Sequence, residues 1–210
     1  MLPDKYVITI GRTFGSGGRA LGRIIAEKLG IGFYDKKLLV KAAEKAGYDI
    51  EFFKSGDERA PKFMGSIIPF SMGFYPVSWL GDTSSAGGDR IYKAQCDFIH
   101  ELALSEPCVI VGRSADYVLR DMKNVINIFV HAPADVCARR IVERLECKDI
   151  AEAKALAERT NKLRANYYNF YTDKQWGNAQ SYDLTFDTSL LPLEEIADIT
   201  IDYLRRRLEY

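Results

Sequence analysis

A glycine-rich stretch near the start of the chain, GRTFGSGGRA, has the residue types of a phosphate-binding loop. An apolar run at residues 7–10 precedes it and predicts a buried strand, and apolar residues at helical spacing follow it and predict a helix. Glycines let the loop backbone approach a ligand closely, and the amides at a helix N-terminus attract anions. The residues that we expect to contact the phosphates of a nucleotide are Arg12, Gly15, Ser16, Gly17, Gly18, Arg19 and Ala20.

Two further features of this stretch bear on that expectation. Ser16 is placed to cap the predicted helix, and Arg12 and Arg19 would add positive charge to the loop. A tight strand-to-helix connection that binds no ligand is the alternative interpretation. Four glycines in eight residues, together with the two arginines, favour the anion site.

The stretch matches the nucleotide phosphate-loop pattern G-x-x-x-x-G-K-[ST] only in part. When the pattern is aligned so that its second glycine is Gly17, Arg12 stands where the first glycine belongs. Gly18 then stands in place of the lysine, and Arg19 in place of the hydroxyl residue. The pattern alone therefore does not decide the function.

A second motif, the dinucleotide fingerprint G-x-G-x-x-[GA], competes for the same residues. Gly15, Gly17 and Ala20 satisfy it, and Asp35 follows about twenty residues later, where a ribose-binding acid is expected. In that fold the glycine turn follows its strand directly. Residues 11–14 intervene here, which favours the longer loop that wraps a terminal phosphate group.

Composition restricts the class of partner. The chain has 210 residues, 47% of them hydrophobic, and its 29 basic residues balance 29 acidic ones. Without a net charge, nucleic acid and membrane surfaces are poor partners, and small-molecule nucleotides are the better expectation. The first ten residues lack the pattern of a targeting segment, so we expect a cytoplasmic protein. Four cysteines without C-x-x-C spacing indicate neither a zinc site nor a disulfide framework.

Strands alternate with helices along the chain. Short apolar runs predict strands at 7–10, 31–35, 108–113, 125–130 and 183–187, and helical patterns lie between them. Such alternation predicts a doubly wound α/β fold with a parallel sheet, whose ligands lie at the carboxyl ends of the strands. Asp35 and Arg113, each at the end of a predicted strand, and Asp116 just beyond should reach that edge.

Two aromatic stretches have no such clear assignment. Residues 60–88 are rich in aromatic residues but show no periodicity, which is typical of a binding loop or of an arm that contacts a partner. Stacking on a base and burial against a second subunit of a homodimer are both consistent with it. Residues 159–176 mix basic and aromatic residues and would suit a small nucleotide or a single-stranded nucleic acid, and the neutral chain favours the nucleotide.

Three segments together resemble the cytidylate kinase-like family of P-loop nucleoside monophosphate kinases: TIGRTFGSGGRALGRIIAEKLGIGFYDKKLL, CVIVGRSADYVLRD, and RTNKLRANYYNFYTDKQWG with SYDLTFDTS. The resemblance implies one domain with a three-layer α/β/α core and a five-stranded parallel sheet. Its core would comprise residues 1–46, 91–150 and 180–210, with a monophosphate-binding insertion at about 47–90 and a helical lid at about 151–179.

The resemblance also implies a reaction, namely phosphoryl transfer from ATP with Mg²⁺ to a nucleoside monophosphate such as CMP or dCMP. By position in the family's motifs, Arg19, Arg159 and Arg164 would stabilise the transferring group. Asp35, Lys37, Arg113, Asp116 and Lys162 would contact the acceptor, and the metal ligands are not assigned.

The chain also departs from the family. Besides lacking the loop lysine and hydroxyl residue, it has Asn161 where the lid carries an acid. A nucleotide-binding sensor on the same fold and a kinase of another small acceptor are therefore the alternative functions.

Overall fold

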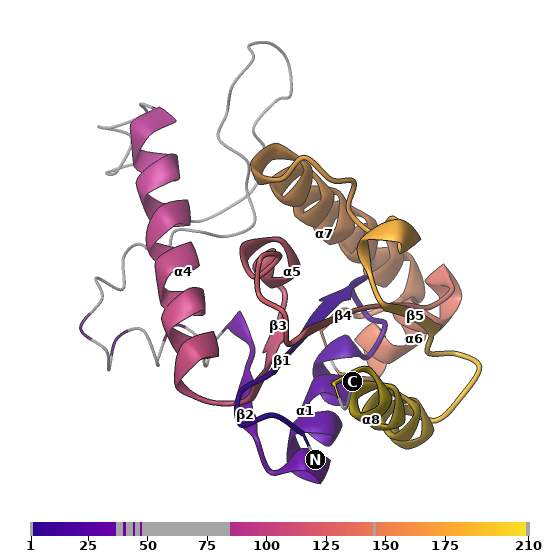
Figure 1. The fold of residues 1–210 in the computed structure, drawn as a ribbon. Coiled ribbons are helices and arrows are strands. Elements are labelled where there is room, and N and C mark those ends of the chain that lie inside the picture. The colour runs from indigo at the N-terminus through magenta and orange to yellow at the C-terminus, as the bar shows by residue number, and fades with distance from the viewer. Residues whose placement is uncertain are drawn as a thin grey trace.

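The computed structural model describes residues 2–36, 40, 44, 47, 85–144 and 146–208. Within them a five-stranded parallel sheet, in the order β2-β3-β1-β4-β5, lies between helices, which confirms the predicted fold class (Figure 1). The strands are β1 (Val7–Arg12), β2 (Gly32–Tyr34), β3 (Cys108–Val111), β4 (Val125–His131) and β5 (Leu184–Asp187). The helices are α1 (Gly18–Leu29), α4 (Ser85–Ser105), α5 (Ala115–Val118), α6 (Ala134–Glu143), α7 (Ile150–Tyr171), η2 (Ala179–Ser181) and α8 (Leu193–Leu208).

Strand β1 is the central strand of the sheet, and every side chain along its first half is buried. Val7 pairs with Cys108 of β3 on one side and with Val125 of β4 on the other. Residues 7–10 are nearly inaccessible to solvent, as expected for a parallel strand with helices on both faces. This continuous apolar run explains why the strand could be recognised in the sequence.

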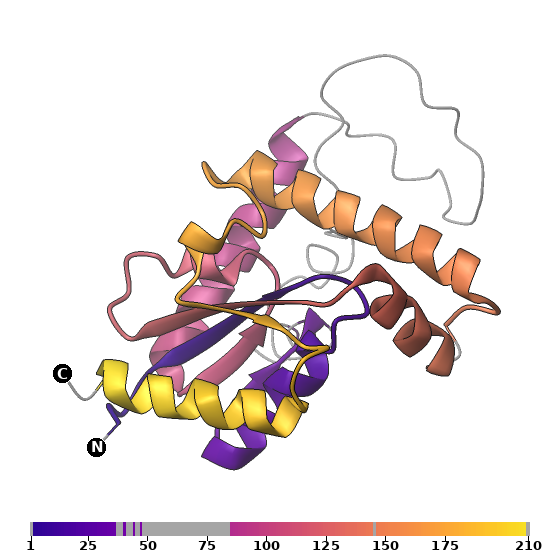
Figure 2. The ribbon, with the colours of Figure 1, turned by 90° about the vertical axis from the view of Figure 1, so that its right-hand side faces the viewer.

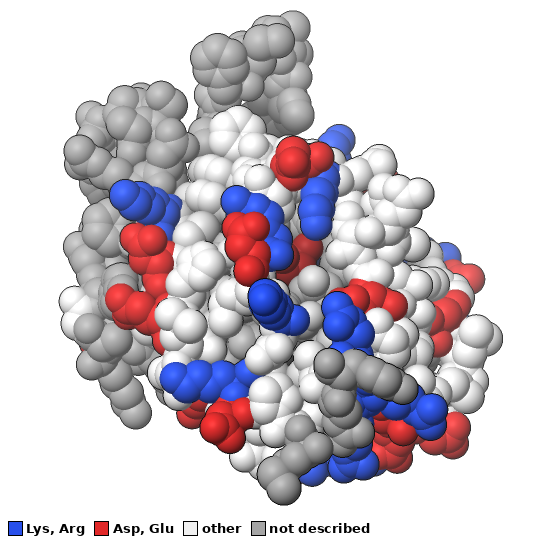
Figure 3. Space-filling view, viewed as in Figure 1, with Lys and Arg blue, Asp and Glu red and all other residues white. Residues whose placement is uncertain are grey.

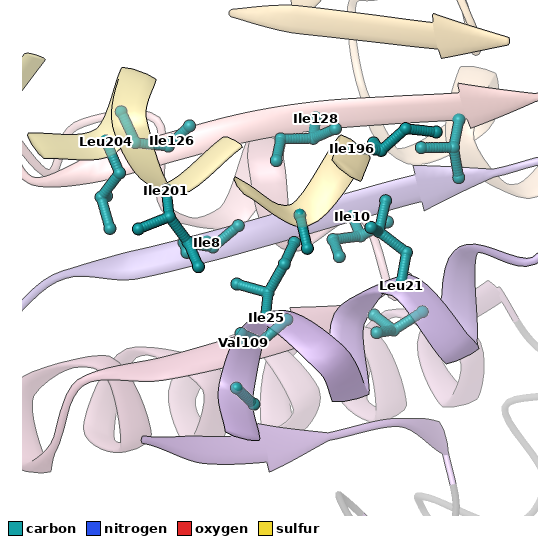
Figure 4. Packing of buried hydrophobic residues seen from close by; sticks show 14 of the residues in the cluster. Ile8, Ile10, Leu21, Ile25, Val109, Ile126, Ile128, Ile196, Ile201 and Leu204 are labelled. Carbon is teal, nitrogen blue, oxygen red and sulfur yellow. The ribbon is translucent and has the colours of Figure 1, made fainter. Parts of the chain in front are cut away.

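One face of the sheet packs against α1 and α8. Figure 4 shows Ile8, Ile10 and Ile128 from the strands meeting Leu21 and Ile25 of α1. Ile196, Ile201 and Leu204 of α8 complete this cluster. The side chains interdigitate, and this packing holds the N-terminal turn of α1 against the end of β1.

The opposite face is covered by α4 and α5. Phe98 and Ile99 of α4 pack with Val118 of α5 against Val7 and Ile110 of the sheet. A smaller cluster joins α6 to α7 through Ala138, Ile141, Ala153 and Ala157. The small alanine side chains let these two helices lie close together.

Helix α7 lies beyond the carboxyl ends of the strands, over the glycine-rich loop. Figures 1 and 2 show it as the long orange helix outside the sheet edge, far from α8. Its residues 161, 164 and 168 form hydrogen bonds with the last residue of β1 and with residues that follow β1 and β3. This helix falls within the predicted lid at about 151–179.

The structure also differs from the sequence-based expectations. Helix α4 begins at Ser85, inside the 60–88 stretch for which no secondary structure was expected. The rest of that stretch, and the predicted insertion at 47–90 apart from Gly47 and residues 85–90, lie outside the described residues. The short elements α5 and η2 were not predicted. None of the described helices is long and apolar enough to cross a bilayer.

Candidate functional site

The glycine-rich loop joins β1 to α1 through two left-handed residues. Gly15 has φ 84° and Gly17 has φ 86°, conformations that glycine adopts without strain. Gly17 is the N-cap residue of α1, and no side chain caps the helix there. The prediction that Ser16 caps α1 is wrong, because its Oγ donates instead to the carbonyl oxygen of Thr13 at 2.9 Å. The first turn of α1 thus begins without a side-chain acceptor.

The loop is packed tightly from behind. A Cβ atom added at Gly15 would lie 2.8 Å from the carbonyl oxygen of Cys137, so a larger residue would displace the backbone. Arg140 of α6 donates to the carbonyl oxygen of Ser16 at 3.2 Å and to Oγ1 and the carbonyl oxygen of Thr188 at 2.9 and 2.8 Å. Thr188 Oγ1 also donates to the carbonyl oxygen of Ser16 at 2.6 Å. These bonds fix the loop in one conformation.

A second unusual turn faces the loop from the end of β3. Gly112, Arg113 and Ser114 all have positive φ angles, of 81°, 65° and 51°. Left-handed backbone is unfavourable for Arg and Ser, and such strained residues cluster at functional sites. The turn positions Arg113, whose side chain is buried in this structure, at the carboxyl edge of the sheet.

Asp116 of α5 is a buried carboxyl group beside this turn. Tyr168 of α7 donates its hydroxyl to Oδ2 of Asp116 at 2.6 Å. Burial raises the pKa of Asp116, and the bond from Tyr168 opposes that shift only in part. Burial and the neighbouring carboxyl also raise the pKa of Tyr168, so its hydroxyl is a stable hydrogen-bond donor.

Helix α7 closes over the loop through two polar contacts. Oδ1 of Asn161 accepts a hydrogen bond from the backbone N–H of Phe14 at 2.7 Å. Nη1 of Arg164 donates to the carbonyl oxygen of Arg12 at 3.2 Å, and the guanidinium carbon lies 5.5 Å from the centre of the Phe14 ring. The predicted lid therefore touches the predicted phosphate loop directly.

A small pocket lies where these elements meet. Its volume is about 20 Å³, enough for one water molecule, so α7 covers the site closely in this conformation. Among the predicted site residues it brings together Arg12, Arg113, Asp116 and Arg164. The other lining residues are Gly11, Gly112, Ser114, Tyr167, Tyr168, Trp176 and Tyr182.

Arg19 and Asp35 form an ion pair between α1 and the end of β2. Nε of Arg19 donates to Oδ2 of Asp35 at 2.5 Å. The arginine side chain is 62% exposed, whereas the aspartate side chain is 8% exposed. The pair joins the first turn of α1 to the end of β2, as expected for residues at the carboxyl edge of a parallel sheet.

The remaining predicted site residues lie further out. Arg159 and Lys162 are exposed on α7, and neither lines the pocket. Ala20 is exposed in the first turn of α1. Lys37 lies outside the described residues.

The described residues fit the phosphates of a nucleotide. The loop has left-handed glycines with no room for a Cβ at Gly15, an uncapped helix start, and three arginines in the adjoining pocket. The described part of the chain contains no group of three or more His, Cys, Asp and Glu suited to a metal ion. Mg²⁺ needs only one or two carboxylates when substrate phosphates supply its other ligands, and Asp35 and Asp116 are acids at this edge.

Charges of both signs are mixed on one face of the molecule. On the face seen in Figure 3, Lys and Arg side chains alternate with Asp and Glu, and neither sign forms a continuous field. The positive charge of the pocket is therefore a local feature, which suits a small phosphorylated ligand better than a polyanion.

Sequence reasoning missed Tyr182 and the structural role of Arg140. Tyr182 lines the pocket, and its ring centre lies 5.0 Å from that of Phe129. Nothing next to Tyr182 in the sequence indicates this contact with a residue 53 positions earlier. The only local signal was the density of aromatic residues after position 166.

Comparison with curated proteins gives two relatives with nucleotide-related names. The chain is 27% identical over 190 residues to the cytidylate kinase of Methanopyrus kandleri, covering 90% of this chain and 88% of that protein. It is 22% identical over 209 residues to an S-adenosylmethionine-dependent nucleotide dehydratase of Lacinutrix mariniflava. That match covers 96% of this chain but only 36% of the dehydratase, so the chain spans about a third of its length.

Solved structures share the fold. An uncharacterised protein from Eubacterium ventriosum superposes with a TM-score of 0.71 at 29% identity, covering 96% of this chain and 99% of that one. Shikimate kinase from Acinetobacter baumannii superposes with a TM-score of 0.52 at 13% identity, covering 96% of this chain and 93% of that one. For gluconokinase from Sinorhizobium meliloti the TM-score is 0.52 at 18% identity, and the match covers 98% of this chain and 94% of that one. At these identities the two kinases show the P-loop kinase fold alone.

The sequence model of the cytidylate kinase-like family matches residues 7–190. The match spans all five strands, the glycine-rich loop and α7. Fold and family together support phosphotransfer to a nucleotide or another small molecule. The chain belongs to the cytidylate kinase-like family.

Proposed function

We propose that the protein transfers the γ-phosphoryl group of ATP to a nucleoside monophosphate, with CMP or dCMP as acceptor. The observation that carries this proposal is the pocket between the loop and the 112–114 turn, which faces Arg12, Arg113 and Arg164. Three arginines that line one pocket beside a glycine loop suit two phosphate groups held close together. The names of both curated relatives refer to nucleotides, which supports a nucleotide acceptor over a sugar or a shikimate-like acid.

The chemistry asks the protein mainly to align donor and acceptor and to neutralise charge. ATP would supply the phosphoryl group, and Mg²⁺ would neutralise part of the phosphate charge. The loop amides from Gly15 to Ala20 would orient the donor phosphates. Arg19, Arg159 and Arg164 would stabilise the charge that spreads over the transferring group.

The acceptor would bind on the other side of the pocket. Arg113 is buried there and, as a planar fork of donors, suits a phosphate group. A monophosphate oxygen is already a nucleophile, so no strong base is needed. The residues proposed to bind the acceptor are Asp35, Lys37, Arg113, Asp116 and Lys162.

Acceptor-dependent ADP production tests the proposal. The assay compares CMP, dCMP, UMP, AMP and no acceptor, each with ATP and Mg²⁺. Turnover with a pyrimidine monophosphate is expected, and silence with every acceptor contradicts the proposal. If ATP still raised the melting temperature in that case, the protein would be a nucleotide-binding module without kinase activity on this panel. The glycine at the lysine position is the feature that favours this second function.

Replacing Arg19 tests its assigned role. Arg19→Ala should lower kcat/KM by about 30-fold, or about 2 kcal/mol, because one preorganised charge is lost from the transition state. Arg23→Ala, one turn further along α1, is the matched control, since that guanidinium carbon lies 5.1 Å from the ring centre of Phe33. Equal rates in the two variants would remove Arg19 from the mechanism.

A further inference from the structure

Two of the three departures from the phosphate-loop pattern, those at positions 12 and 18, lie in contact with one another. Arg12 is the last residue of β1, and Gly18 is the first residue of α1. A Cβ atom added at Gly18 would lie 2.7 Å from Cβ of Arg12 and 3.1 Å from its Cγ. The stem of Arg12 thus fills the space through which a side chain at position 18 would leave the helix.

The charged end of Arg12 lies further along, at the 112–114 turn. A Cβ atom added at Gly112 would lie 2.1 Å from Nη1 of Arg12 and 2.8 Å from its Cζ. The Arg12 guanidinium therefore lies directly against Gly112, whose φ is 81°. The guanidinium lines the same pocket as Arg113 and Arg164.

A lysine at position 18 is excluded while Arg12 is present. Besides the Arg12 stem, Cγ2 of Val130 would lie 2.7 Å from the added Cβ. Real Cβ atoms do not approach other atoms this closely, so the helix start or both neighbours would have to move. Arg12 and Val130 together therefore require glycine at position 18.

We propose that Arg12 supplies, from the strand side of the loop, the positive charge that the lysine of a G-x-x-x-x-G-K loop supplies from the helix side. The inference rests on the proposed function, because it assigns a donor-phosphate contact within that site. In the motif, the first position is glycine and the lysine follows the second glycine. In this chain the arrangement is exchanged, so that the first position carries the cation and the lysine position is bare.

This assignment separates the roles of the two loop arginines. Arg19 stands at the hydroxyl position of the motif and is engaged with Asp35 at 2.5 Å. Arg12 passes over the helix start and reaches the pocket. The planar guanidinium of an arginine can donate to two phosphate oxygens at once. A lysine ammonium acts instead as a single point charge.

Binding of ATP, measured by titration calorimetry with Mg²⁺, tests the inference without relying on turnover. Arg12→Gln keeps most of the stem over Gly18 and removes the charge, and it should weaken ATP binding by about tenfold or more. Arg12→Lys keeps the charge but loses the two-donor geometry of the guanidinium. Its ATP affinity should lie between those of Arg12→Gln and the unmodified chain. Circular dichroism and the melting temperature verify that each variant folds.

Exchanging the two residues provides the decisive comparison. Arg12→Gly combined with Gly18→Lys restores the motif spacing. All proteins in this comparison also carry Val130→Ala, which removes the remaining clash with position 18. Arg12→Gly alone should lose ATP affinity by about tenfold, and the combined variant should recover to within about threefold of the Val130→Ala reference. Gly18→Lys with Arg12 retained should bind poorly or fold poorly.

The outcomes distinguish the inference from the proposed function. If Arg12→Gln folds and binds ATP as the unmodified chain does, the inference is overturned while the kinase proposal stands. The inference is also overturned if the exchange variant folds but does not recover ATP affinity. A lysine at position 18 would then not replace the charge of Arg12. If the unmodified chain binds no ATP, the proposed function fails, and the inference fails with it.

Discussion

At the scale of single residues, Arg140 shows how a cation near a phosphate loop can serve structure. Its guanidinium donates to Ser16 and twice to Thr188, so it joins the loop to the segment after β5. Arg140→Ala should lower the free energy of unfolding by about 2 kcal/mol, because three charge-assisted bonds are lost from a half-buried site. Chemical denaturation measures this change.

Arg144 is the matched control for Arg140. It lies at the end of the same helix and pairs with Glu146 at 3.0 Å, with both side chains more than a third exposed. Arg144→Ala should cost less than about 1 kcal/mol, since exposed ion pairs contribute little. Comparable losses in the two variants would contradict the proposed anchoring of the loop.

Asp116 should make stability depend on pH. Because burial raises its pKa above the ordinary 3.8, the neutral form is favoured in the folded state. Its contribution to stability is present below 3.8 and is lost as the pH rises through the raised pKa. Asp116→Asn does not titrate, so its unfolding free energy relative to the unmodified chain should increase over that range. A difference that stays constant with pH would show that Asp116 titrates normally.

At the scale of elements, α7 is attached to the loop by side chains in its middle. Asn161→Ala removes the acceptor for the N–H of Phe14. Hydrogen exchange in the middle of α7 should accelerate about fivefold, which corresponds to about 1 kcal/mol of lost local stability. Exchange in β1 and β4 should not change, because their ladder does not depend on this contact.

Lys162→Ala is the control for this helix. Lys162 is the next residue along α7 and is exposed. Alanine is a good helix former, so exchange should stay as in the unmodified chain. If both variants accelerate exchange equally, the Asn161 contact does not hold the helix.

Elements could be predicted where burial produced a pattern along the chain. Residues 7–10 and 108–111 are continuous apolar runs because helices cover both faces of the sheet. The start of α4 at Ser85 was missed because Gly87 and Gly88 are poor helix formers. The predicted Ser16 cap was wrong because Gly17 is the N-cap residue of α1, and the Ser16 hydroxyl donates to the carbonyl oxygen of Thr13.

The candidate site was predictable only in part. The loop, Arg113, Asp116 and Arg164 follow from motif positions at the carboxyl edge of the sheet. Tyr182 and the crossing of Arg12 over Gly18 depend on contacts between elements, which have no local signature. The left-handed Ser114 could not be expected either, because the conformation is rare for any residue but glycine.

At the scale of the whole molecule, the cluster between the sheet, α1 and α8 holds the site elements together. Ile128 is fully buried in it, whereas Ile199 on α8 is 44% exposed. Ile128→Val should lower the unfolding free energy by about 1 kcal/mol, and Ile199→Val by less than about 0.5 kcal/mol. Thermal or denaturant unfolding compares them, and equal effects would mean that this cluster does not determine stability.

The tight cover over the pocket has a kinetic consequence. A space of about 20 Å³ admits only a water molecule, so a phosphate group that enters this pocket to reach Arg113 would require α7 to move away from the loop. Association would then follow two steps, and its observed rate would level off at high ligand concentration at the rate of helix opening. The same cover would slow departure of the products, so turnover would follow the motion of α7 more closely than the phosphoryl transfer itself.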